Sequence, residues 1–147
     1  MKLHLGCWKR NIPGWVNVDL CDFPHIHYKR SIDDLSCFKN ETADVIYSSH
    51  SLEYFDRDKV GEVLREWRRV LKIGGTIRLA VPDFKALAEI YLQYGDLNHI
   101  LGPLYGKMRI SNEDIDKTLY HKTVYDEKSL TLILESNGFH KVKRYDW

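Results

Sequence analysis

The strongest constraint on the fold is an amphipathic helix pattern that lies between two apolar, strand-like runs. Apolar residues recur at helical spacing here, and they are Val60, Val63, Leu64, Trp67, Val70 and Leu71. Asp56 can cap the start of this helix, and Gly74-Gly75 is typical of a helix end. The flanking runs Ala43–Ser48 and Thr76–Val81 are rich in β-forming residues. This region therefore predicts a strand–helix–strand unit.

Shorter elements alternate in the same way along the rest of the chain. The further expected strands lie at 3–5, 15–20, 25–29 and 139–147, and the further expected helices lie at 84–94 and 126–137. Residues 95–123 contain Gly-Pro and single glycines, and we expect an irregular loop there on the substrate side. The alternation predicts one α/β domain over residues 1–147 with a mostly parallel sheet.

Length and charge exclude several classes of protein. The chain has 147 residues, 44% of them hydrophobic and 29% charged, which is typical of one globular domain. A formal net charge of +1 gives no reason to expect nucleic-acid binding. No apolar run approaches the roughly 20 residues of a membrane span, and the N-terminus does not resemble a signal peptide. Cys7, Cys21 and Cys37 form no C-x-x-C pair, so we expect reduced thiols and a cytoplasmic protein.

Polar residues and glycine follow several of the expected strands, where an open parallel sheet binds its ligands. Gly6 follows the first strand and lets the backbone approach a ligand closely. Asp19 ends the second strand, where a carboxylate can accept both hydroxyls of a ribose. His50 follows the fourth strand and can transfer a proton near neutral pH. A turn glycine, a capping carboxylate and a hydrogen-bonded loop histidine are the structural alternatives.

A metal site is not expected. His25 and His27 share a face of the expected third strand, but no third ligand stands near them in the sequence. A nicotinamide dehydrogenase is also disfavoured, because no G-x-G-x-x-G follows the first strand.

Several motifs occur in an order that resembles one family. The motifs are Leu3–Cys7 with Pro13–Leu20, Ala43–Phe55, Glu66–Gly75, Arg78–Phe84, Tyr120–Asp126 and Ser136–Phe139. Together they resemble a small class I S-adenosylmethionine-dependent methyltransferase, similar to methyltransferase type 11, of the kind found in polysaccharide biosynthesis clusters. The resemblance covers almost the whole chain, and motifs in the correct order are more specific than any single motif.

The resemblance implies a Rossmann-like sheet with helices on both faces and S-adenosyl-L-methionine as the cofactor. The implied cofactor-binding residues are Leu5, Gly6, Cys7, Asp19, Leu20, Ile32, Asp33, Ser48 and Ser49. Asp19 would hold the ribose hydroxyls, Ile32 and Asp33 would lie near the adenine, and Ser48 and Ser49 would border the methionine and the sulfonium.

The implied reaction is transfer of a methyl group to a small-molecule or saccharide acceptor. The sulfonium is already a strong electrophile, so the protein mainly supplies positioning and desolvation. A hydroxyl acceptor also needs a base, and the candidates are His121, His50 and Asp83 in that order.

Three features depart from the family pattern. Trp8 stands where a second glycine is usual, and its bulk would cover the cofactor or occupy its place. Residues 8–14 are too few for the crossover helix that normally joins the first two strands. The turn signal Pro13-Gly14 alone favours a hairpin, whereas the resemblance favours parallel strands with a tight link, which we expect.

The third departure is the missing antiparallel strand after Phe139–Trp147. An uncovered edge strand is a liability, so we expect another subunit to cover it, or the chain to be a fragment. Trp8 and this missing strand motivate an alternative function, a methyltransferase-like domain that has lost catalysis and serves as a binding or assembly module.

Overall fold

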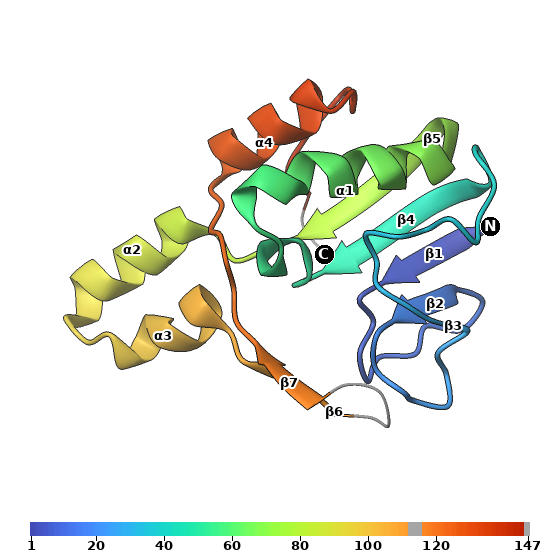
Figure 1. The fold of residues 1–147 in the computed structure, drawn as a ribbon. Helices are drawn as coiled ribbons and strands as arrows, with labels where there is room; N and C mark the ends of the chain where they lie inside the picture. Colours follow the sequence, from blue (N-terminus) through green and yellow to red (C-terminus); the bar gives the residue numbers. More distant parts are fainter. Residues whose placement is uncertain (112–115, 146–147) are drawn as a thin grey trace.

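A computed structural model describes residues 1–111 and 116–145, and its centre is a five-stranded parallel sheet (Figure 1). The strands follow the spatial order β3-β2-β1-β4-β5. They are β1 (Lys2–Leu5), β2 (Val16–Asp19), β3 (Tyr28–Lys29), β4 (Ala43–Ser49) and β5 (Leu71–Ala80). The predicted α/β class and the mostly parallel, Rossmann-like sheet are confirmed. The chain reverses its direction of travel across the sheet between β1 and β4, which is where open parallel sheets bind ligands.

The link between β1 and β2 is short and contains no helix. The two strands are parallel, with Leu3 opposite Val16 and Leu5 opposite Val18. Two tight turns shorten the link, since the amide of Arg10 donates to the carbonyl of Cys7 at 2.8 Å and that of Trp15 to the carbonyl of Ile12 at 3.1 Å. The tight parallel link is therefore confirmed, and the hairpin alternative is excluded.

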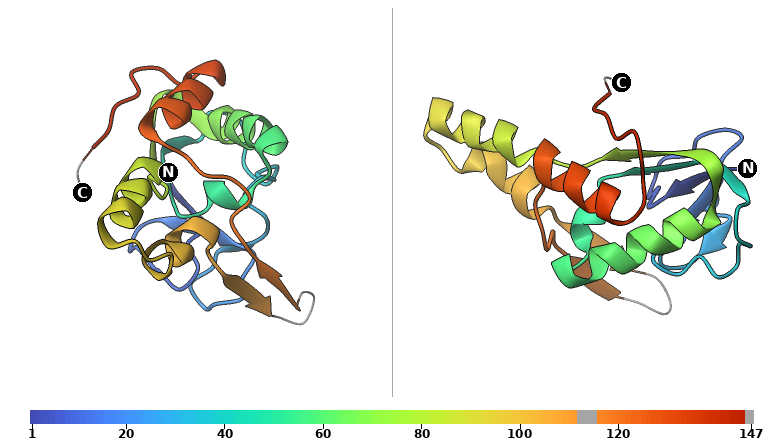
Figure 2. Two further views of the ribbon diagram at one scale, coloured as in Figure 1. Left: turned by 90° about the vertical axis from the view of Figure 1, so that its left-hand side faces the viewer. Right: turned by 90° about the horizontal axis from the view of Figure 1, so that it is seen from above.

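Helix α1 (Arg57–Val70) covers one face of the sheet. Its buried residues are Val60, Val63, Leu64, Trp67 and Val70, as the helical spacing predicts. They pack with Leu3, Leu5 and Ile46 of the sheet in one hydrophobic core. Helix α4 (Glu127–Ser136) lies beside α1 on the same side (Figure 2), and Leu134 enters the same core. The side chain of Asp126 accepts from the amide of Ser129 and caps this helix.

The opposite face of the sheet carries polar and aromatic side chains, so the helices that pack on the sheet share one face. The ring of Tyr47 lies 5.1 Å from that of His4 and 6.1 Å from that of Trp15. Steps β1→β2 and β4→β5 cross the sheet in opposite directions, so right-handed crossovers place their connections on opposite faces. The link between β1 and β2 therefore runs over the face opposite α1 (Figure 2). Because this link contains no helix, that face lacks the helix that a sheet with helices on both faces would carry there.

Helix α1 ends earlier than Gly74-Gly75 predicts. It stops at Val70, and β5 begins at Leu71, which is buried and pairs with Ala43. The register then shifts so that Val45 pairs with Thr76, and residues 72–75 are accommodated as a bulge. Gly74 permits this bulge because its φ is +78°. The pairing of Leu71 with Ala43 in the sheet therefore ends the helix before the position that Gly74-Gly75 predicts.

Residues 95–123 are more regular than expected. Helix α2 (Phe84–Tyr94) lies where it was predicted, and it is followed by α3 (Asn98–Tyr105). Strands β6 (Met108–Ser111) and β7 (Asp116–Leu119) form an antiparallel pair. The prediction of an irregular loop is therefore wrong. Pro103 lies inside α3, where the Gly-Pro signal falsely indicated a break.

The expected last strand is not formed by residues 139–145, and the rest of that prediction lies outside the described residues. Phe139 is buried in the core, and Arg144 forms ion pairs with Asp83 and Glu127. Side-chain burial and ion pairs hold this segment instead of strand pairing. The edge strand that was expected to need another subunit is therefore absent from these residues.

Candidate functional site

A cleft of about 530 Å³ opens beyond the carboxyl ends of β1, β2 and β4, at the reversal point of the sheet. The β6–β7 hairpin and the start of α1 line its other side. This volume suits a ligand of cofactor or drug size. Among the predicted site residues, the cleft is lined by Gly6, Cys7, Asp19, Leu20, Ile32, Asp33, Ser49 and His50.

Gly6 forms the floor of the cleft and must be glycine for two reasons. Its φ of +68° lies in the left-handed region. A Cβ atom at Gly6 would also lie 2.1 Å from the Oγ atom and 2.8 Å from the Cβ atom of Ser51, so Ser51 would have to move. The chain thus leaves β1 in a tight turn whose backbone is exposed to the cleft.

Asp19 is the most firmly held carboxylate of the site. One oxygen accepts from the amide of Trp8 at 2.7 Å, and the other accepts from the amide of Cys21 at 2.8 Å. The side chain is nearly buried, yet it borders the cleft. Each carboxylate oxygen has a second lone pair, so Asp19 can still accept hydrogen bonds from a diol.

The two thiols near Asp19, those of Cys7 and Cys21, are buried. Burial, reinforced by the charge of Asp19, raises the pKa of Cys7 and that of Cys21 to about 12. Both therefore stay protonated at neutral pH.

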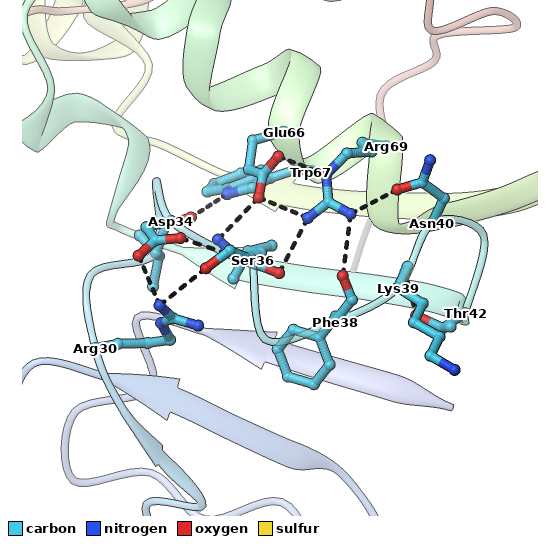
Figure 3. A network of polar contacts seen from close by, with 12 residues as sticks. Arg30, Asp34, Ser36, Phe38, Lys39, Asn40, Thr42, Glu66, Trp67 and Arg69 are labelled. Carbon is cyan, nitrogen blue, oxygen red and sulfur yellow. Dashed lines mark hydrogen bonds and ion pairs between the residues drawn. The ribbon is translucent and has the colours of Figure 1, made fainter.

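A polar network fixes the loop that carries Ile32 and Asp33 (Figure 3). The indole nitrogen of Trp67 donates to the carbonyl of Ile32 at 2.6 Å. Arg69 pairs with Glu66 and donates to the carbonyls of Leu35 and Phe38. Helix α1 therefore holds the loop in place through its last two turns, and Ile32 lines the cleft from a fixed backbone.

His50 and Glu53 form a pair at the end of β4. The Nδ1 atom of His50 lies 3.3 Å from Oε1 of Glu53, and the His50 side chain is 54% exposed at the cleft. Glu53 is only 1% exposed, and neither of its carboxylate oxygens accepts a hydrogen bond from another described residue. The contact with Glu53 raises the pKa of His50, although partial burial opposes it. His50 is thus a proton acceptor that faces the cleft and is supported by a buried carboxylate.

His121 lies behind this pair and does not line the cleft. Its Nε2 atom is 3.8 Å from Oε1 of Glu53, its ring contacts that of Tyr54, and its Nδ1 atom is 3.1 Å from the carbonyl oxygen of Pro103. Asp83 also lies away from the cleft, where it caps α2 by accepting from the amide of Lys85 at 3.1 Å.

Two predicted cofactor residues also lie away from the cleft. Leu5 and Ser48 sit on the face of the sheet that packs against α1, and both are buried. Ser49, the next residue, points to the other face and reaches the cleft. The alternation of side chains along a strand explains this split.

Sequence reasoning missed the side of the cleft that the hairpin supplies. Met108 is opposite Leu119 and Ile110 is opposite Lys117, so these four side chains share one face of the hairpin. All four line the cleft. The alternation Met-Arg-Ile-Ser is present in the sequence, but four residues beside Gly106 are a weak strand signal.

Neither a cluster of metal ligands nor a membrane-spanning helix is found among the described residues. No group of three or more ligating side chains in residues 1–111 and 116–145 is arranged to hold a metal ion. No helix among them is long and apolar enough to cross a membrane.

Comparisons with known proteins agree with this architecture. Residues 16–79 match the family described as Methyltransferase domain. A SAM-dependent methyltransferase from Archaeoglobus fulgidus superposes with a TM-score of 0.64 at 20% identity, over 97% of this chain and 62% of that one. A methyltransferase from Methanosarcina mazei superposes with a TM-score of 0.59 at 16% identity, over 92% of this chain and 77% of that one.

A third structure contains bound ligands. It is the 1,6-didemethyltoxoflavin-N1-methyltransferase of Burkholderia thailandensis with 1,6-didemethyltoxoflavin and S-adenosylhomocysteine. It superposes with a TM-score of 0.61 at 14% identity, over 97% of this chain and 61% of that one. No curated protein sequence matches the chain. The chain spans less than two thirds of the length of two of these three structures. The chain therefore has the fold of the class I S-adenosylmethionine-dependent methyltransferases, and residues 16–79 match their methyltransferase-domain family.

Proposed function

We propose that this protein binds S-adenosylmethionine in the cleft and transfers its methyl group to a small-molecule or saccharide acceptor. The observation that carries the proposal is the Asp19 carboxylate, fixed by two amides at the reversal point of the sheet and open to the cleft. A carboxylate with free lone pairs at this place suits a ribose diol. The three free cysteines accord with a cytoplasmic location.

The cofactor supplies an activated methyl group, and the residues of this chain supply position and proton transfer. Asp19 holds the ribose, and the turn at Gly6 admits the methionine part. Ile32 and Asp33 flank the adenine, and Leu20 contacts it. Ser49 borders the sulfonium. The resemblance implies these roles, and all six residues line the cleft, which supports them.

His50 is the base that we assign to a hydroxyl acceptor. It lines the cleft beside Ser49, whereas His121 and Asp83 do not. With the cofactor bound, the neutral imidazole would take the proton of the acceptor hydroxyl while the methyl group passes from the sulfur to that oxygen and the cofactor leaves as its thioether. Glu53 would stabilise the imidazolium that results. His121 packs behind Glu53, so we assign it a supporting role.

The position of Trp8 favours an enzyme over a domain that has lost its cofactor. Its side chain lines the cleft and is 45% exposed, so it forms part of the wall and leaves the cleft open. Its backbone has a φ of 45°, which a glycine would adopt without strain. The amide that holds Asp19 belongs to the backbone, so it does not depend on the indole.

Titration with S-adenosylhomocysteine tests the proposal. We expect saturable binding by calorimetry, and D19N should weaken it by about tenfold or more because an amide nitrogen replaces one acceptor oxygen. D22N is the matched control, because Asp22 is exposed and lies outside the cleft. Absence of binding at millimolar concentration, or equal affinity in D19N, would contradict the proposal.

A further inference from the structure

The described residues that line the cleft carry an excess of positive charge. Five cationic side chains line the cleft, and they are Arg10, Lys59, Lys107, Lys117 and Lys122. Among the described residues, three carboxylates accompany them, and they are Asp19, Asp33 and Asp56. The whole chain has a formal net charge of only +1, so the charge is gathered here.

Neighbouring residues account for part of this charge. Lys122 pairs with Asp56 at 2.8 Å. Arg10 belongs to the link after β1, and its charge acts on His4 and His50 at the carboxyl ends of β1 and β4. Arg10 therefore lies on the side of the cleft that we assign to the cofactor.

Three lysines remain. Lys59, Lys107 and Lys117 form no ion pair with any other described residue, although all three line the cleft. They come from separate elements, since Lys59 lies in the first turn of α1, Lys107 precedes β6 and Lys117 lies in β7. Like charges that share a cleft repel one another, and an anion in that cleft relieves the repulsion.

The hairpin supplies both charge and apolar surface to this part of the cleft. Lys117 shares its inner face with Met108, Ile110 and Leu119, and Ile110 is fully buried. A ligand here would place an apolar or ring-shaped body against these side chains and an anionic group among the lysines. Lysine ammonium groups are common ligands of phosphate.

We propose that the methyl acceptor carries a phosphate or pyrophosphate group, which binds between Lys107 and Lys117 of the hairpin and Lys59 of α1. This proposal rests on the proposed methyl transfer. It adds the chemical class of the acceptor, which neither the family match nor the resemblance supplies.

Titration of pyrophosphate into the protein saturated with S-adenosylhomocysteine tests this site. We expect saturable binding that weakens with added salt, and K107Q/K117Q should weaken it by roughly tenfold or more. K128Q is the matched control, because Lys128 is exposed on α4 and lies outside this cleft. All three substituted lysines are exposed, and thermal melting will verify that the variants fold.

The outcomes separate the two proposals. No saturable pyrophosphate binding, or equal affinity in K107Q/K117Q, overturns the phosphate site while S-adenosylhomocysteine binding still stands. Malonate that binds as tightly as pyrophosphate also overturns it, since the site would then not distinguish a phosphate from a carboxylate. If S-adenosylhomocysteine does not bind, the proposed function fails. Titration of pyrophosphate into the protein without S-adenosylhomocysteine then tests the lysine site independently.

Discussion

Glu53 shows at the scale of single residues how a buried charge governs its neighbours. Its carboxylate is surrounded by His50, His121 and Tyr54 and is shielded from water. The same charge that raises the pKa of His50 also contributes to raising the pKa of Tyr54, although burial is the larger cause there. Glu53 therefore acts on His50, the member of this cluster that faces the cleft.

Replacement of Glu53 by glutamine should lower the pKa of His50. Its pKa is now above the ordinary 6.5 because the histidine cation is stabilised by the carboxylate. Titration of the His50 ring protons by NMR will measure the change, and E62Q on the exposed face of α1 is the control. An unchanged His50 pKa in a folded E53Q variant would refute the pairing.

The same substitution should alter stability in a pH-dependent way. A raised folded-state pKa contributes stability in full below the unfolded value of 6.5, and this stability is lost as pH rises through the folded value. E53Q should therefore lower the free energy of unfolding by more at pH 5 than at pH 8. Urea unfolding at both pH values measures the two losses.

At the scale of elements, helix α1 holds the loop that borders the cleft. Trp67 is buried, and its indole donates to the carbonyl of Ile32. We expect W67F to lower the free energy of unfolding by about 2 kcal/mol, because a buried carbonyl loses its donor and a small cavity remains. Urea unfolding measures this value, and W15F on the opposite face of the sheet is a control with a smaller expected loss.

Elements with long, uniform patterns could be predicted from the sequence, and those that depend on tertiary contacts could not. The spacing of apolar residues in α1 and the motifs at Gly6 and Asp19 identified the helix and much of the cleft. The start of β5 depends on the pairing of Leu71 with Ala43. The place of His121 depends on Glu53 and Pro103, which are distant in the sequence.

At the scale of the whole molecule, stability is distributed unevenly. β1 and β4 lie inside the sheet, and most of their core-facing side chains are fully buried. The α2–α3 pair extends away from the sheet (Figures 1 and 2), and each of its helices has a single buried residue, Leu87 or Ile100. Local opening therefore costs least there.

Amide hydrogen exchange should reveal this gradient. We expect the slowest exchange in β1 and β4 and the fastest helical exchange in α2 and α3, measured by mass spectrometry on peptic fragments. Protection of α2 and α3 equal to that of α1 would contradict the expected distribution.

The short link between β1 and β2 also affects how the cleft is assembled. The entropy lost when a loop closes grows with its length, by about 0.6 kcal/mol for each doubling. Gly6, Trp8 and Asp19 lie within fourteen consecutive residues, so one brief closure brings them together. A crossover helix would have separated them and delayed their meeting. The half of the cleft that carries Asp19 is thus a local structure that can form early, before the hairpin, which is distant in the sequence, completes the other half.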